Sequence, residues 1–150
     1  MMALVLPSAL KAQIEGEARA ALPRECCGLI EGVRRGEGVE AVALHPAPNL
    51  ATDAHRFEID PGAQFAALRA ARVNGREIVG CYHSHPNGAA EPSAHDLAGA
   101  SEEGFLWLIA ATARSEKAAR MAAFVFTGGR FVPVTLGNSA SLDPAAGLRL

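Results

Sequence analysis

Apolar residues recur at helical spacing in two segments of the chain. In the first, residues 8–22, they stand on one helical face: Leu10, Ile14, Ala18 and Leu22. Ser8 is the expected cap of this helix, and Pro23 forbids its continuation. In the second, residues 60–74, a capping residue precedes a proline at the start, and Gly75 stops the pattern. The sequence therefore predicts a helix in each segment.

Shorter apolar or alternating runs, separated by turn-forming residues, predict strands. These runs cover residues 26–30, 39–44, 57–59, 78–85, 105–110, 121–127 and 130–134. The run at 105–110 is continuous, which is typical of a central strand covered on both faces. The last two runs flank Gly128-Gly129, a hairpin signal. The order of the elements predicts an α/β fold, in which helices cover the faces of a mixed sheet.

Length and composition indicate one domain. A chain of 150 residues, 49% of them hydrophobic, can bury a single core. We assign this domain to residues 1–136. Residues 137–150 are rich in Ser, Ala, Gly and Pro and carry no strong pattern, so we expect a loose C-terminal tail.

Charge and hydropathy argue against several classes of partner. The net charge is −2 and no cluster of Lys and Arg is present, unlike in nucleic-acid-binding proteins. The longest apolar run, residues 105–111, is too short to span a bilayer. The first residues lack the basic region and cleavage site of a signal peptide. We therefore expect a cytoplasmic protein that binds neither nucleic acid nor membrane.

The richest chemistry lies in residues 83–96, which read HSHPNGAAEPSAHD. His83 and His85 are two positions apart on a predicted strand, so both imidazoles project from the same face. Asp96 follows near the start of a helix predicted over residues 93–103. Two histidines and one carboxylate are three metal ligands that leave a fourth tetrahedral position open, as in catalytic rather than structural zinc sites.

Each part of this pattern has a simpler interpretation when taken alone. An isolated His-x-His pair on a strand is usually a surface feature or a hydrogen-bonded pair. Ser93 and Asp96 by themselves form a capping box. His95, beside Asp96, is expected to be exposed. The conjunction of the parts at fixed spacing favours the metal site.

The three cysteines offer a different chemistry. A Cys26, Cys27 or Cys81 nucleophile assisted by His83 or His85 is one alternative, although it leaves the downstream serine and aspartate without a task. The simpler interpretation is that the cysteines are small buried side chains, with Cys81 at the floor of the histidine site.

The pattern as a whole resembles the signature of the JAMM (MPN+) zinc metallopeptidases. The matching segments are His83-Ser84-His85, Ser93-Ala94-His95-Asp96, Glu25 within PRECCGL, residues 56–61 and Gly80-Cys81-Tyr82. Together they cover roughly residues 20–112 and look most like the short bacterial members of the family.

This resemblance implies a three-layer α/β fold similar to that of cytidine deaminases. It also implies one zinc ion per chain, held by His83, His85 and Asp96. In the implied mechanism Glu25 moves the proton of the attacking water, and Ser93 donates a hydrogen bond to the oxyanion. Deaminase chemistry itself is not expected, because the His-x-Glu and Pro-Cys-x-x-Cys ligands are absent from the sequence.

Two further assignments stay open. Glu31, on the far side of the same predicted strand, and Glu91, in the loop before the third helix, are rivals of Glu25 for the role of base. Asn49 lies in the loop of residues 45–54, a region that the resemblance puts near the substrate channel, so it is a candidate substrate contact.

Three functions are compatible with the sequence. The first is a peptidase or isopeptidase acting at the Gly-Gly C-terminus of a ubiquitin-like or sulfur-carrier protein, which the resemblance implies for short bacterial members. The second is a zinc hydrolase of small peptides or cell-wall fragments, and the third is a non-catalytic scaffold of the same fold. The five intact site residues argue against the scaffold. We predict the first function, with a carrier protein as partner. The oligomeric state, including a homodimer, stays open.

Overall fold

The structure, a computed structural model, describes residues 2–86, 88–112 and 119–138. In these residues the elements follow one another as β1 (Ala3–Val5), α1 (Ser8–Ala21), β2 (Cys27–Arg35), β3 (Gly38–Ala47), α2 (Pro61–Val73), β4 (Glu77–Pro86), α3 (Ala94–Gly99), β5 (Leu106–Thr112), β6 (Arg120–Thr127) and β7 (Arg130–Gly137). The three helices are thus interspersed among the strands of the described chain, as expected for an α/β fold.

All seven strands belong to one mixed sheet, in the order β1-β3-β2-β4-β5-β6-β7. β4 pairs antiparallel with β2 and parallel with β5, so it lies in the interior of the sheet. β1 pairs in parallel with both β3 and β7, which closes the sheet on itself. The sequence pattern missed β1, because three residues are too few to show a period.

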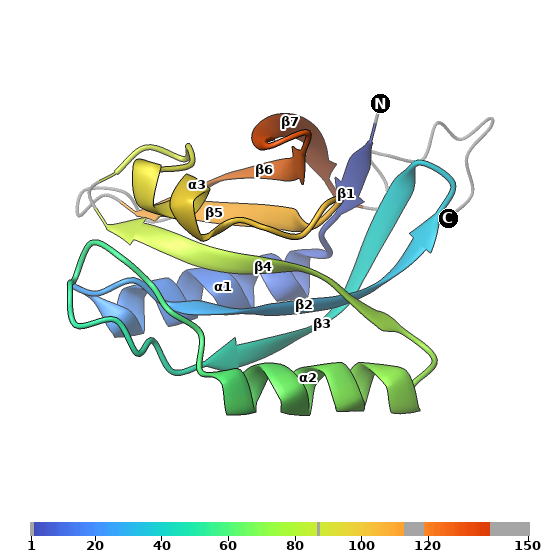
Figure 1. Cartoon of the computed structure of the whole chain (residues 1–150), viewed down its shortest axis with the longest axis horizontal. Coiled ribbons are helices and arrows are strands. Elements are labelled where there is room, and N and C mark those ends of the chain that lie inside the picture. The colour runs from blue at the N-terminus through green and yellow to red at the C-terminus, as the bar shows by residue number, and fades with distance from the viewer. Residues whose placement is uncertain (1, 87, 113–118, 139–150) are drawn as a thin grey trace.

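The two long helices cover opposite faces of the sheet (Figure 1). One core cluster joins α1 to the sheet through buried residues that include Ile14, Ala18, Tyr82 and Leu108. The other joins α2 to the sheet through residues that include Ala67, Ala71, Cys81 and Trp107. The neighbouring residues Cys81 and Tyr82 of β4 therefore face different helices. The sheet and the helical layer on each of its faces form the predicted three-layer arrangement.

The ends of two helices differ from the prediction. Ser8 is the first residue of α1 and not its cap; the cap is Pro7, whose carbonyl accepts backbone hydrogen bonds from the first turn. α3 ends at Gly99 instead of residue 103, because Ala100 takes an extended conformation.

Residues 57–59 were predicted to be a strand, and this prediction is wrong. In the described chain they contribute an isolated bridge between Asn49 and Ile59 and no strand. The predicted hairpin is confirmed: Gly128 and Gly129 connect β6 to β7 with φ angles of 60° and 78°. Positive φ at both central residues is what a type I′ turn requires.

The last described strand reaches the predicted domain boundary. Gly137, the final residue of β7, pairs with Val5 of β1. Residues 139–150 of the predicted tail lie outside the described residues. Of the helices in the described ranges, none has both the length and the apolar content that crossing a membrane demands.

Gly80 is required where β4 runs beside β5. A Cβ atom at this position would lie 2.3 Å from the carbonyl oxygen of Leu106, which is backbone and cannot rotate away. We expect Gly80→Ala to lower the free energy of unfolding by about 3 kcal/mol, the upper part of the usual range for overpacking. Urea denaturation measures this change.

Gly16 provides the matched control. It lies within α1, and an added Cβ would meet no atom within 4 Å. Gly16→Ala should raise the free energy of unfolding by about 0.5–1 kcal/mol, since alanine has the higher helix propensity. Equal stability of the Gly80→Ala protein and the wild type would contradict the close approach of the two strands.

Candidate metal centre

β4 brings two histidines to one face of the sheet. His83 lies opposite Cys27 of β2 and beside Ile109 of β5, and it is completely buried. His85 is two residues further along, and its side chain is 11% exposed. The Nε2 atoms of the two rings are 2.9 Å apart. His83 and His85 lie two and four positions after Cys81 on the same strand. All three side chains therefore project from the face that α2 covers.

α3 delivers a carboxylate to the same point. Ser93 caps this helix by accepting a hydrogen bond from the backbone N–H of Asp96, while the Asp96 carboxylate accepts one from the backbone N–H of Ser93. This capping box orients Asp96 so that its Oδ2 lies 3.1 Å from Nε2 of His83 and 3.2 Å from Nε2 of His85. Figure 1 shows α3 near the arrowhead end of β4, where the histidines lie. The capping box is therefore part of the site and not an alternative to it.

The three converging atoms fit a tetrahedral zinc ion. Nitrogen and oxygen ligands at roughly 2.0–2.2 Å from such an ion lie about 3.3 Å from one another. The separations of 2.9, 3.1 and 3.2 Å among the three side chains approach that value. Imidazole nitrogen and carboxylate oxygen are also donors that zinc prefers. The residues present thus fit the metal that the resemblance implies.

Glu25 adds a second carboxylate to this group. It stands just before β2, is 5% exposed, and has a ligand atom within 4.8 Å of those of His83 and His85. Its Oε1 has no hydrogen-bond partner in the described chain. A buried polar atom without a partner is costly, so its persistence here points to an interaction with a cation or with a bound water. Glu25, His83 and His85 form a buried group that can hold a metal ion.

The site shifts the ionisation of its members. Burial lowers the pKa of His83, although Asp96 opposes this effect. Burial raises the pKa of Glu25 to about 7, against the attraction of His85. For Asp96, burial alone would raise the pKa, but the hydrogen bonds with His83 and His85 outweigh it and the pKa is lowered. Asp96 is therefore ionised and His83 neutral at pH 7, which are the states that ligate metals.

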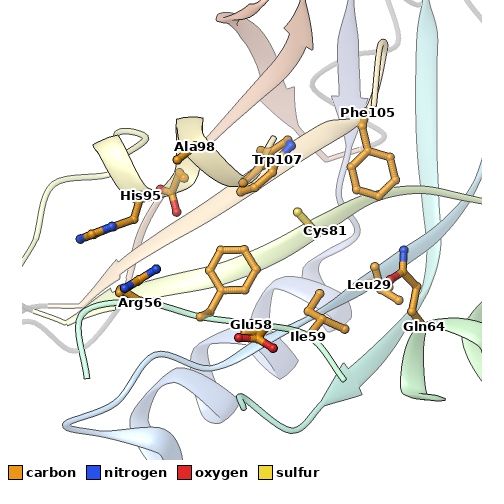
Figure 2. A pocket seen from close by; sticks show the side chains of 13 residues that line it. Leu29, Arg56, Glu58, Ile59, Gln64, Cys81, His95, Ala98, Phe105 and Trp107 are labelled. Carbon is orange, nitrogen blue, oxygen red and sulfur yellow. The ribbon is translucent and has the colours of Figure 1, made fainter. Parts of the chain in front are cut away.

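A groove extends from Asp96 across the α2 face of the sheet. It has a volume of about 420 Å³. Figure 2 shows its apolar floor and its two sides: Leu29, Cys81 and Trp107 lie on strands, His95 and Ala98 come from α3, and Arg56, Glu58 and Ile59 come from the segment before α2. An apolar groove with polar edges beside a donor cluster is the usual form of a ligand site.

Residues 7–126 match the family described as prokaryotic homologs of the JAB domain. The chain belongs to this family. A desampylase from Haloferax volcanii is 36% identical to it over 110 residues, which are 73% of this chain and 74% of that protein. A probable TtuB-protein conjugate cleaving protease from Thermus thermophilus is 33% identical over 97 residues, 64% of this chain and 62% of that protein.

Solved structures agree with the MPN fold. The solution structure of a protein from Desulfitobacterium hafniense has a TM-score of 0.78 and 29% identity, and the match covers 91% of both chains. The crystal structure of a JAB1/MPN domain protein from Archaeoglobus fulgidus has a TM-score of 0.52 and 19% identity, covering 91% of this chain and 96% of that one. The predicted JAMM resemblance and MPN fold are confirmed. Family, fold and the Glu25-His83-His85 group are those of a JAMM-type metalloprotease.

In this JAB domain, Glu31 lies far from the histidines. It pairs with Ile78, five residues before His83 on β4, and its carboxylate is bound by Nε2 of His45 at 2.8 Å and by Nη1 of Arg76 at 3.3 Å. The buried Glu31 is thus satisfied by its own partners at a different point of the sheet. Glu91 is exposed in the loop before α3.

The cysteines of this JAB domain are buried and free. Burial raises the pKa of the Cys26 thiol to about 11 and that of Cys27 to about 12, and it raises the pKa of Cys81 well above its usual value. Because the thiolate is the nucleophile, this environment does not favour the cysteine alternative. Cys81 and Asp96 both line the groove.

Two residues near the metal centre were not assigned correctly from the sequence. The Phe57 ring stacks on the His83 ring, with 4.3 Å between centroids; the pattern gave no sign of this contact, because it joins distant segments. Asn49 was a candidate substrate contact, but its side-chain amide is fully engaged within the protein. Phe57 lies in the matching segment of residues 56–61, and Asn49 lies in the loop of residues 45–54.

Proposed function

We propose that this protein is a zinc-dependent peptidase or isopeptidase that hydrolyses an amide bond at the Gly-Gly C-terminus of a ubiquitin-like or sulfur-carrier protein. The observation that carries the proposal is the convergence of His83, His85 and Asp96 within 3.2 Å of one another, beside the buried carboxylate of Glu25. Both named prokaryotic relatives, a desampylase and a probable conjugate cleaving protease, support it.

His83, His85 and Asp96 are the proposed ligands of one zinc ion per chain. When bound, zinc supplies a Lewis acid that acidifies water and polarises the scissile carbonyl. The three side chains contribute one negative charge, so the centre keeps a net positive charge. The apolar surroundings of His83, with Phe57 and Trp107 at its ring, exclude competing water from the buried side of the site.

Glu25 is the proposed base. Its position within 4.8 Å of the histidine ligand atoms leaves it close enough to touch a water that the site holds. Its Oε1 has no partner in the described chain that would compete for the proton. We infer that Glu25 accepts the proton of the attacking water and then gives it to the leaving amine.

Ser93 is the proposed oxyanion donor. Its Oγ accepts the hydrogen bond of the Asp96 N–H at 3.0 Å, which uses a lone pair and leaves the hydroxyl proton free to donate. Because the capping box joins Ser93 to Asp96, the hydroxyl is held next to a proposed ligand. A hydrogen bond from this hydroxyl to the developing oxyanion stabilises the transition state.

The substrate chain must pass the centre in an extended form. The scissile carbonyl has to reach the site while neighbouring side chains stay outside, and glycine permits the closest approach of a backbone. The segment of residues 45–54, rich in Ala and Pro, contacts Glu25 through Asn49. The segment of residues 88–92, which contains Gly88, Pro92 and two alanines, contacts His85 through Ala89. We infer that narrowness between these loops selects Gly-Gly tails.

This selection is tested with the zinc-loaded protein and a carrier that bears a C-terminal extension. Carriers with Gly, Ala or Val at the position that donates the carbonyl are compared by intact mass. We expect release of the extension after Gly-Gly, and cleavage after Val at least about tenfold slower, since each misfit methyl group in a tight site costs 1–3 kcal/mol.

The outcomes separate the proposed function from its alternatives. Cleavage of short peptides without cleavage of any folded carrier would favour the hydrolase of small peptides. Absence of hydrolysis despite bound zinc would favour the non-catalytic scaffold. Equal rates for Gly and Val would show that the loops do not act as the filter.

A further inference from the structure

Asn49 uses every hydrogen-bonding position of its side chain inside the protein. Its Oδ1 accepts the backbone N–H groups of Ala51 at 2.9 Å and Glu58 at 3.0 Å. Its Nδ2 donates to the backbone carbonyls of Glu25 and Arg56, both at 3.0 Å. An asparagine amide has two donor and two acceptor positions, so these four bonds leave none for a substrate.

Two of the four Asn49 hydrogen bonds hold the backbone on both sides of Phe57. The carbonyl of Arg56 and the N–H of Glu58 flank Phe57 on either side, and Asn49 binds both. The backbone of Phe57 is thereby fixed although the segment around it forms no strand. A fixed backbone sets the direction of the Cα–Cβ bond and so limits the Phe57 ring to a few rotamers, of which the one seen stacks on His83.

The Phe57 ring in turn holds His83. The two rings are stacked with an interplanar angle of 22° and a centroid distance of 4.3 Å, and the Trp107 ring meets His83 edge-on at 5.9 Å. A metal-ligating histidine is ordinarily oriented by a hydrogen bond from its other ring nitrogen. The buried Nδ1 of His83 has no such partner in the described chain. Aromatic packing therefore takes over the orienting role.

The other hydrogen bond of the Asn49 Nδ2 is donated to the backbone carbonyl of Glu25, so Asn49 also holds the backbone at Glu25. We propose that Asn49 is a positioning residue that holds Phe57 against the ligand His83 and, at the same time, holds Glu25 beside the centre. This inference rests on the proposed metal site. It assigns a role to Asn49 and Phe57, neither of which is a proposed metal ligand or a catalytic group.

Asn49→Asp is the sharpest test, because it preserves the shape and the acceptor Oδ1 but turns an oxygen toward the carbonyls of Glu25 and Arg56. We expect zinc affinity, measured by chelator competition, to fall about tenfold or more, as for other residues that orient ligands. We expect kcat to fall about 100-fold, as small misplacements of catalytic groups do. With cobalt in place of zinc, the visible absorption bands should shift, since they report ligand geometry.

Phe57 supplies a second, independent pair of variants. Phe57→Leu keeps an apolar side chain without a ring and should reproduce the loss of metal affinity and the shift of the cobalt bands. Phe57→Tyr keeps the ring and should leave the metal affinity and the cobalt bands as in the wild type. Because Asn49 acts through Phe57, the loss of affinity in the double variant Asn49→Asp, Phe57→Leu should stay close to the larger of the single losses. Thr52→Ala, an exposed change in the same loop, is the matched control and should alter none of these quantities.

The results separate this inference from the proposed function. A wild-type protein that binds no zinc would overturn the metal site and this inference with it. Wild-type zinc affinity and cobalt bands in both Asn49→Asp and Phe57→Leu would overturn the inference alone. Additive losses in the double variant would also overturn it, since they would show that the two residues act separately.

Discussion

Replacing Glu25 by Gln should lower the rate of hydrolysis by about 10²–10⁴-fold, the usual contribution of a general base. The amide has the shape of the carboxylate but cannot accept a proton at neutral pH. Because His83, His85 and Asp96 are untouched, bound zinc should stay at the wild-type level. The rate of carrier cleavage, followed by intact mass, and the zinc content of the same sample give both quantities.

Glu31→Gln is the matched control for this change. Glu31 lies on β2, which begins just after Glu25, and it is also buried. Its carboxylate is bound by His45 and Arg76, opposite Ile78 of β4 rather than at the histidines. Activity per folded molecule should therefore remain close to that of the wild type. Loss of activity in Glu31→Gln with normal activity in Glu25→Gln would show that the base has been assigned to the wrong glutamate.

The second large effect is expected from removing both histidines. Zinc binding at protein sites is worth about 10–16 kcal/mol for four ligands, so two ligands account for roughly 5–8 kcal/mol. The double variant His83→Ala, His85→Ala should thus bind zinc about 10⁴-fold more weakly or worse. Chelator competition measures the affinity, and circular dichroism checks that the variant is folded. His55→Ala, which removes an exposed histidine, should leave the affinity unchanged.

Much of the fold was predictable from local patterns. The apolar runs around residues 78–85 and 105–110 became β4 and β5, and the glycine pair at 128–129 became the turn between β6 and β7. Local patterns failed where tertiary contacts decide the structure. β1 is too short to show a period and exists because β3 and β7 flank it, and α3 ends early at Gly99.

The same division holds for the site. The shared face of His83 and His85 follows from strand parity alone, and the helix-start position of Asp96 follows from its capping box. The burial of Glu25 and the partners of Glu31 could not be derived from spacing, because they depend on which strands become neighbours. The role of Asn49 could not be derived from spacing either. An asparagine in a loop has the same sequence signal whether it binds a substrate or the protein's own backbone.

Metal content of the purified, zinc-loaded protein tests the central claim most directly. Plasma mass spectrometry on the wild type and on the double variant His83→Ala, His85→Ala gives zinc per chain. The proposed centre predicts one equivalent in the wild type and almost none in the variant. One full equivalent of zinc in the double variant would contradict the assignment of the metal to His83, His85 and Asp96.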